Sequence, residues 1–174
     1  PSLTYTNIVI CITGVGSVDF HCLISDSIAD LCFVKQGNGG AQYFPLYWYE
    51  ERKASQASLF DDGKNKYIRH DAITDFILKR AQGQYGPKVT KEDIFYYVYG
   101  FLHCPTYRET FANDLKMMLP RLPLVEKAED FWAFSRAGRE LADLHLNYEQ
   151  VPATKEVVVD WHNTVSYTHL TLPT

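Results

Sequence analysis

The chain has 174 residues, of which 46% are apolar and 14% aromatic, and its 17 Lys and Arg residues against 21 Asp and Glu residues give a net charge of −4. The aromatic content excludes a disordered tail, and the length suits one domain of ordinary size. Free-standing DNA-binding domains usually carry a basic excess, so any nucleic-acid contact here must depend on a local surface or on neighbouring domains.

Neither a membrane span nor a secretory signal is predicted. No apolar run approaches the roughly 20 residues of a transmembrane helix, and residues 1–7 lack the basic and apolar stretches of a signal peptide. The cysteines, Cys11, Cys22, Cys32 and Cys104, form neither a CxxC motif nor a zinc-ligand spacing with histidine. We therefore expect buried, reduced thiols in a cytoplasmic protein, with no metal site and no membrane partner.

We interpret the chain as a fragment that is truncated at both ends. The first residue is Pro1 rather than Met, and residues 165–174 show no amphipathic period. This last segment resembles the translation of a sequencing-library adapter, so we interpret it as an artefact and exclude it from the fold. Residues 151–164 are expected to form a tail, in which residues 157–159 are a candidate closing strand.

Strands are predicted in the first third of the chain. Four apolar, β-branched or aromatic runs carry the signal, at residues 7–13, 20–25, 28–34 and 41–49. Because Pro45 has no N–H to donate, the fourth run should lie at a sheet edge or be interrupted there. The near-continuous apolar runs indicate a sheet that is covered on at least one face.

Helices are predicted after residue 70. Asp71 is a candidate cap for a helix through Gln82, whose apolar face would carry Ile73, Phe76, Ile77 and Arg80. Thr90 and Asp93 have the spacing of a capping box, and a helical stripe follows them at Ile94, Tyr97, Val98, Phe101 and Leu102.

Two more helices are expected at residues 105–119 and 130–148. Pro105 suits a first helical turn, and Pro120 and Pro123 end that helix. Across the helices we expect one common cluster, formed by Tyr97, Phe101, Phe111, Leu115, Phe134 and Leu141.

The predicted fold class is α+β. A mixed β-sheet layer in residues 1–50 would pack with a helical subdomain in residues 71–150, and both would belong to one recognition domain. Residues 51–70 between them are dense in charge, Ser, Gln and Gly, which indicates an exposed linker or loop.

Catalytic motifs are absent from the sequence. It has no phosphate-binding GxxxxGK[ST] loop, no GxSxG elbow and no tetrapeptide typical of adenine methyltransferases. Gly14 and Gly16 follow a strand, but the third glycine and the helix of a dinucleotide site are missing. His103 and His145 are expected to have packing roles. We therefore predict no catalytic residue and no cofactor in this segment.

A binding surface remains as the candidate functional feature. Amide and Lys side chains that can read base edges surround three glycines, at Lys35, Gln36, Asn38 and Gln42. Cations that can meet phosphates follow in the linker, at Lys53, Lys64, Lys66 and Arg69. The alternatives are an ordinary hairpin loop and a solvated surface loop.

Several segments resemble one known family. The motif TKEDIFYYVYGFLH at residues 90–103 is followed, in order, by similar segments at 105–109, 113–123, 131–134 and 141–149, and it is preceded by similar segments at 10–16, 28–31 and 42–50. Together they cover roughly residues 8–149. They resemble the carboxy-terminal target-recognition domain of type ISP single-polypeptide restriction–modification enzymes.

The resemblance implies an α+β domain that reads an asymmetric site on double-stranded DNA. It would present this site to nuclease, helicase-like ATPase and N6-adenine methyltransferase domains upstream in the same polypeptide. Those domains would use S-adenosylmethionine, ATP and Mg²⁺, and this fragment would hold no cofactor. The alternative is a non-enzymatic protein-interaction module that docks a partner through the helical stripe at residues 94–102.

Overall fold

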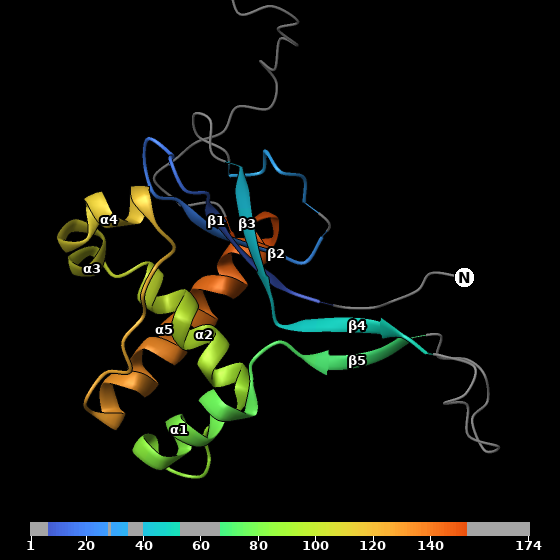
Figure 1. Cartoon of the computed structure of the whole chain (residues 1–174), viewed down its shortest axis with the longest axis vertical. Helices are drawn as coiled ribbons and strands as arrows, with labels where there is room; N and C mark the ends of the chain where they lie inside the picture. Colours follow the sequence, from blue (N-terminus) through green and yellow to red (C-terminus); the bar gives the residue numbers. More distant parts are fainter. Residues whose placement is uncertain (1–6, 28, 35–39, 53–66, 153–174) are drawn as a thin grey trace, which may run out of the picture.

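The computed structural model describes residues 7–27, 29–34, 40–52 and 67–152 (Figure 1). The strands are β1 Val9–Thr13, β2 Cys22–Ser25, β3 Ala41–Pro45, β4 Tyr47–Glu51 and β5 Tyr67–Asp71. The helices are α1 Asp75–Tyr85, α2 Lys91–Leu102, α3 Pro105–Thr110, α4 Ala112–Met117 and α5 Ala128–Leu146, followed by a 3₁₀ turn at Tyr148–Gln150. This content confirms the α+β class. The helices of the described residues are too short or too polar to cross a membrane.

Strand β1 is the centre of an antiparallel three-stranded sheet with the order β2-β1-β3. Its side chains alternate between two cores, because successive residues of a strand point to opposite faces. Ile10 and Ile12 belong to the main core together with residues of the helices, whereas Cys11 packs with Val34 and Ala41 on the other face. Both faces of β1 are therefore covered, which agrees with the prediction of a sheet covered on at least one face.

No strand forms at residues 29–34, the described part of the strand expected at residues 28–34. Leu31–Val34 is a turn, in which the Asp30 carboxylate accepts a hydrogen bond from the Cys32 N–H at 2.6 Å and the Asp30 carbonyl accepts one from Phe33 at 3.1 Å. An aspartate that bonds the backbone two residues ahead closes a turn and competes with strand pairing. This turn then places Val34 over Cys11.

The fourth predicted strand is interrupted at Pro45. An interruption there was one of the two outcomes expected from the missing N–H of proline, the other being an edge position. The chain leaves the first sheet there, buries Leu46, and starts a second, two-stranded sheet with β4. The Leu46 N–H donates to the Ile8 carbonyl and its carbonyl accepts from Ala72, each at 2.9 Å. Leu46 is therefore the pivot between the two sheets.

The predicted bounds of the linker, residues 51–70, are wrong at both ends. Glu51 ends β4, and Tyr67–Asp71 forms β5, which pairs with β4 in an antiparallel hairpin. Residues 53–66 lie outside the described part of the chain. Because Asp71 belongs to β5, helix α1 begins later than predicted, and Thr74 caps it by accepting from the Ile77 N–H at 3.5 Å. The buried face of α1 carries Ala81 and Tyr85, while Phe76 is 70% exposed.

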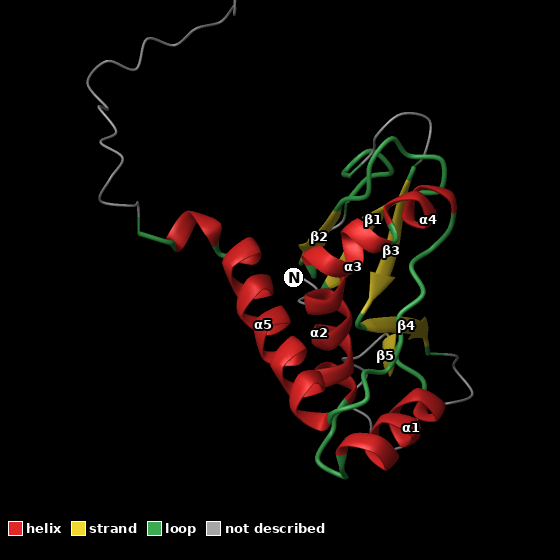
Figure 2. Cartoon of the chain, turned by 90° about the vertical axis from the view of Figure 1, so that its left-hand side faces the viewer, coloured by secondary structure: helices red, strands yellow, loops and turns green. Residues whose placement is uncertain are grey.

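Helices α2 and α5 lie side by side and pack closely against each other (Figure 2). The predicted capping box at Thr90 and Asp93 is present. The two helices meet at glycines: a Cβ atom on Gly138 would lie 2.7 Å from the Gly100 nitrogen and would overlap the Tyr96 carbonyl oxygen. Only glycine therefore permits this helix spacing.

Aromatic rings fill the space around this contact. Phe131 of α5 is fully buried and stacks on Tyr85 of α1 at 4.3 Å and on Tyr97 of α2 at 5.0 Å between ring centroids. The hydroxyls of these tyrosines donate to the Val125 and Pro123 carbonyls, both at 2.6 Å. Each buried hydroxyl is thereby satisfied, and the segment before α5 is tied to the core.

The predicted common cluster is confirmed for five of its six members. Tyr97, Phe101 and Leu115 are buried in the main core, and Phe134 and Leu141 pack against it. Phe111 is 44% exposed instead. It lies at the junction of α3 and α4, where φ is −108° and ψ is 22°, so the helical phase changes there and a single stripe through residues 105–119 does not exist.

The cysteines are all free, and their burial differs. Cys11 and Cys22 are buried, and burial raises the pKa of these thiols to about 11 and about 12. Cys32 is exposed on the Asp30 turn, which contradicts the expectation that the thiols are buried. Cys104 is partly buried before α3.

Two histidines pack where α2 ends against α5. The Tyr99 hydroxyl and the His145 Nδ1 atom lie 2.6 Å apart, and the His103 ring meets the Tyr99 ring edge-on at 4.8 Å. These contacts confirm the packing roles expected for both histidines. Burial, with smaller contributions from His145 and Arg108, lowers the pKa of His103 from 6.5 to about 4.

We predict that Gly138→Ala destabilises the fold by about 2–3 kcal/mol, because the added methyl group forces two helix backbones apart. Urea unfolding of the two proteins measures the difference. The matched control is Gly83→Ala in α1, where a Cβ atom would meet nothing within 4 Å. This change should be neutral or stabilise by up to about 1 kcal/mol. Equal stability of Gly138→Ala and the wild type would contradict the helix contact.

We also predict that His103 makes the fold sensitive to acid. The unfolded chain binds the imidazole proton near pH 6.5 and the folded chain only near pH 4. Stability from the neutral ring is therefore complete above pH 6.5 and is lost as the pH falls toward 4. Since His103 is only partly buried, the loss should be about 1–2 kcal/mol. Unfolding of the wild type and His103→Gln at pH 7.5 and 5 tests this, and an equal pH dependence would refute it.

Candidate nucleic-acid interface

Two of the eight predicted DNA-binding residues lie in the described part of the chain, Gln42 and Arg69. The other predicted positions lie outside it, at Lys35, Gln36, Asn38, Lys53, Lys64 and Lys66. The structure places Gln42 and Arg69 on different sheets, Gln42 on β3 and Arg69 on β5. Both side chains are exposed.

Gln42 is exposed because of its place in the sheet. It pairs with Ile12 of β1, so its side chain points to the same face as this buried isoleucine. However, β3 is an edge strand of the three-stranded sheet. The core therefore covers Ile12 on the central strand but does not extend over Gln42. The amide is thus held on a rigid strand at the rim of the core, where a polar partner can reach it.

Arg69 lies opposite Tyr49 in the β4–β5 hairpin. Its guanidinium carbon is 4.3 Å from the centre of the Tyr47 ring. A cation–π contact occupies the face of a guanidinium, while its N–H donors lie in the plane and point outward. The arrangement holds the charge in place and suits a contact with a phosphate oxygen.

The other face of the hairpin carries residues that the sequence analysis did not select. The Trp48 ring is 47% exposed and stacks on the opposite His70 at 4.2 Å and an interplanar angle of 17°. The His70 Nε2 atom lies 3.3 Å from a Glu50 carboxylate oxygen, within ion-pair distance but without hydrogen-bond geometry. The sequence feature that could have pointed to this aromatic pair is the run of three successive aromatic residues at 47–49, because a strand must direct one or two of them to each face.

The base of the hairpin is fixed to the helices. Tyr47 donates from its hydroxyl to Glu92 at 3.0 Å, and the Asn7 amide bonds both the N–H and the carbonyl of Tyr47. Lys91 of α2 bridges Asp71 at 2.9 Å and Asp75 at 2.6 Å. These hydrogen bonds raise the pKa of Lys91 and lower the pKa of Asp75, so both groups stay charged at neutral pH. The far end of the hairpin projects away from the helices (Figure 1).

Comparisons with known proteins agree with this architecture. The chain is 32% identical to part of the protein in a cryoEM structure of a DrdV–DNA complex, with a TM-score of 0.69 over 84% of this chain and 13% of that one. It is 31% identical to the ATP-dependent Type ISP restriction-modification enzyme LlaBIII bound to DNA, with a TM-score of 0.64 over 87% of this chain and 9% of that one.

A third structure is a nuclease-deletion mutant of the Type ISP restriction-modification enzyme LlaGI in complex with a DNA substrate mimic. The identity is 31% and the TM-score 0.56, over 87% of this chain and 9% of that one. The chain thus spans about a tenth of the length of these proteins. A search of curated proteins finds no match. The model of the Type ISP C-terminal specificity domain matches residues 1–169, and the chain therefore belongs to this family.

Proposed function

We propose that this chain recognises a specific sequence of double-stranded DNA as part of a longer type ISP restriction–modification polypeptide. The observation that carries the proposal is its identity of 31–32% to three proteins solved with DNA or a DNA mimic, over 84–87% of the chain. These matches favour DNA over the alternative of a protein-interaction module as the main function.

The geometry of the hairpin supports this function. A two-stranded antiparallel ribbon fits the major groove of B-DNA, in which each base pair shows a distinct pattern of donors and acceptors. The β4–β5 hairpin is such a ribbon, with exposed Trp48 and Arg69 and a base fixed to α2. A preorganised ribbon loses little conformational entropy when it binds.

The charge of the domain indicates how its affinity arises. The described hairpin carries charges of both signs, with Glu50, Glu51 and Asp71 beside Arg52 and Arg69, and the whole chain carries −4. Phosphate contacts dominate the affinity of most DNA-binding proteins. We therefore assign most of the affinity to other parts of the polypeptide and the choice of sequence to this domain.

The chemistry of the parent protein belongs to those other parts. Adenine methylation, ATP hydrolysis and DNA cleavage would use S-adenosylmethionine, ATP and Mg²⁺ in the domains upstream of this one. In the described segments, no three His, Cys, Asp or Glu side chains gather as a metal site would require. These reactions on DNA would take place in the cytoplasm of a prokaryote.

For Gln42 we predict a change in sequence preference. If its amide reads a base edge, Gln42→Ala should cost about 1–3 kcal/mol at one position of the site and leave other sequences unaffected. The parent polypeptide should be assayed by methylation of a library of sites. The control is Gln150→Ala, an exposed glutamine after α5. The same experiment applies to Gln36 and Asn38. An unchanged sequence preference in all these variants would show that these amide side chains do not read bases.

For Arg69 we predict a uniform loss of affinity. If it contacts a phosphate, Arg69→Gln should weaken binding to all sequences alike and reduce the slope of log K against log salt by about one. Lys53, Lys64 and Lys66 should behave in the same way. Arg136→Gln on α5 removes the same charge from another exposed position. Equal slopes for the Arg69 and Arg136 variants would show that Arg69 does not touch DNA.

A further inference from the structure

Exposed apolar side chains gather where α4 ends. Phe111 is 44% exposed, Met117 72%, Met118 41% and Leu119 44%. We call these four residues the α4 patch. Scattered apolar residues are normal on a surface, but a contiguous group with this exposure marks a site that another surface covers.

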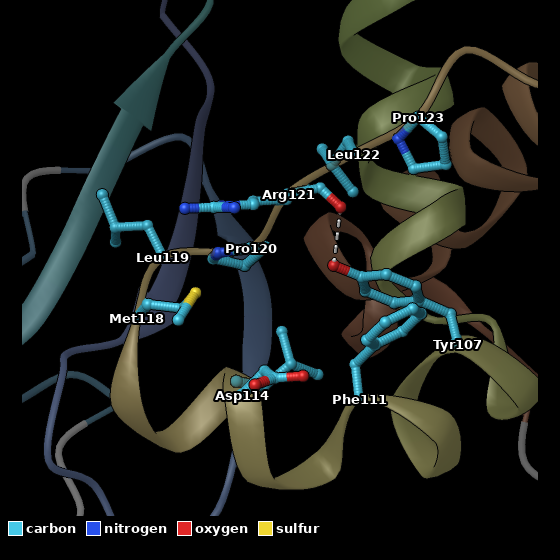
Figure 3. A pocket seen from close by; sticks show the side chains of 10 residues that line it. Tyr107, Phe111, Asp114, Met118, Leu119, Pro120, Arg121, Leu122 and Pro123 are labelled. Carbon is cyan, nitrogen blue, oxygen red and sulfur yellow. Dashed lines mark hydrogen bonds between the residues drawn. The ribbon is translucent and has the colours of Figure 1, made fainter.

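A cavity of about 540 Å³ opens beside this patch (Figure 3). Met118 and Leu119 line one side of it, and Phe111, Leu122 and Pro123 line the other. The charged side chains in its lining are Asp114 and Arg121. The cavity is therefore suited to large apolar side chains, with one charge of each sign at hand.

Hydrogen bonds hold the walls of this cavity in place. The Tyr107 hydroxyl donates to the Arg121 carbonyl at 3.1 Å across the opening (Figure 3). The Gly16 N–H donates to the Lys116 carbonyl at 2.8 Å, and the Lys116 ammonium lies 3.3 Å from Asp19. The β1–β2 loop thus supports the end of α4. A preformed apolar cavity of this kind can take a partner without an ordering cost.

The relatives indicate what covers the patch. The chain spans only 9–13% of their length, and its family is a C-terminal domain, so a much longer part of the polypeptide precedes it. Helices α3 and α4 lie across helices α2 and α5 from the β4–β5 hairpin in Figure 1. A surface with so few cations does not suit phosphates. We propose that the α4 patch docks this domain on an apolar surface of the preceding part of the same polypeptide.

Methionine oxidation tests this interface directly. Met117 and Met118 are the only two methionines of the chain, and both lie in one tryptic peptide, residues 117–121. Exposed methionine is oxidised readily to its sulfoxide, and a covered side chain should react at least about tenfold more slowly. We expect rapid oxidation of the isolated 174-residue chain and strong protection in the full polypeptide without DNA.

A pair of matched variants separates docking from other causes. Leu119→Asp should return the oxidation rate in the full polypeptide to within about twofold of the isolated chain, because a buried unpaired charge opposes docking. Leu144→Asp changes a leucine that is 50% exposed on α5 and should retain the protection. Thermal unfolding of the isolated chains should match the wild type for both.

Three outcomes would overturn the proposal: equal oxidation of the isolated and the full-length protein, protection that appears only when DNA is added, or protection of the isolated chain that accompanies a dimer in sedimentation. The last would identify a second copy as the occupant. Binding of DNA by the same samples is measured separately. Absence of sequence-specific DNA binding by the wild-type full polypeptide would refute the proposed function and would not affect the docking result.

Discussion

The approach of α2 and α5 at Gly100 and Gly138 is the contact on which the rest of the domain depends. With no side chain between them, the two backbones come close enough for Phe131 to reach Tyr85 and Tyr97 in one aromatic core. Close-packed interiors transmit small displacements, because there is little free volume to absorb them. A wider spacing between α2 and α5 would therefore displace every element that packs on this helix pair.

The β4–β5 hairpin, the proposed binding surface, is one of those elements. Helix α2 holds the hairpin through Glu92 and Lys91, which contact Tyr47 and Asp71 at the base of β4 and β5. The same two residues lie in the first turn of α2, where the capping box at Thr90 fixes the helix start. The direction of the ribbon is thus set by the N-terminus of α2. A specificity element needs such rigid support, since base contacts tolerate errors of only a fraction of an ångström.

Local chemistry made much of this fold predictable. The capping box, the break at Pro45 and the strand at residues 7–13 follow from short-range rules, and each is present. The failures have long-range or competing causes. Asp30 closed a turn inside an apolar run, and β5 formed in a polar segment because β4 offered it a partner. The stacked Trp48 and His70 could not be predicted, because their contact depends on a strand register that sequence periodicity does not reveal.

The two proposed surfaces also explain the composition. A domain that bound DNA alone would need a basic face, yet this chain carries −4, and three of its described cations, Lys91, Lys116 and Arg139, pair with Asp or Glu. If the α4 patch docks the domain as proposed, it would need no such face, because the polypeptide that held it would also hold the DNA. Docking converts recognition into an intramolecular step with a high effective concentration. Weak intrinsic affinity then becomes an advantage, since discrimination between sites depends on differences among base contacts and is not masked by strong attraction to every phosphate.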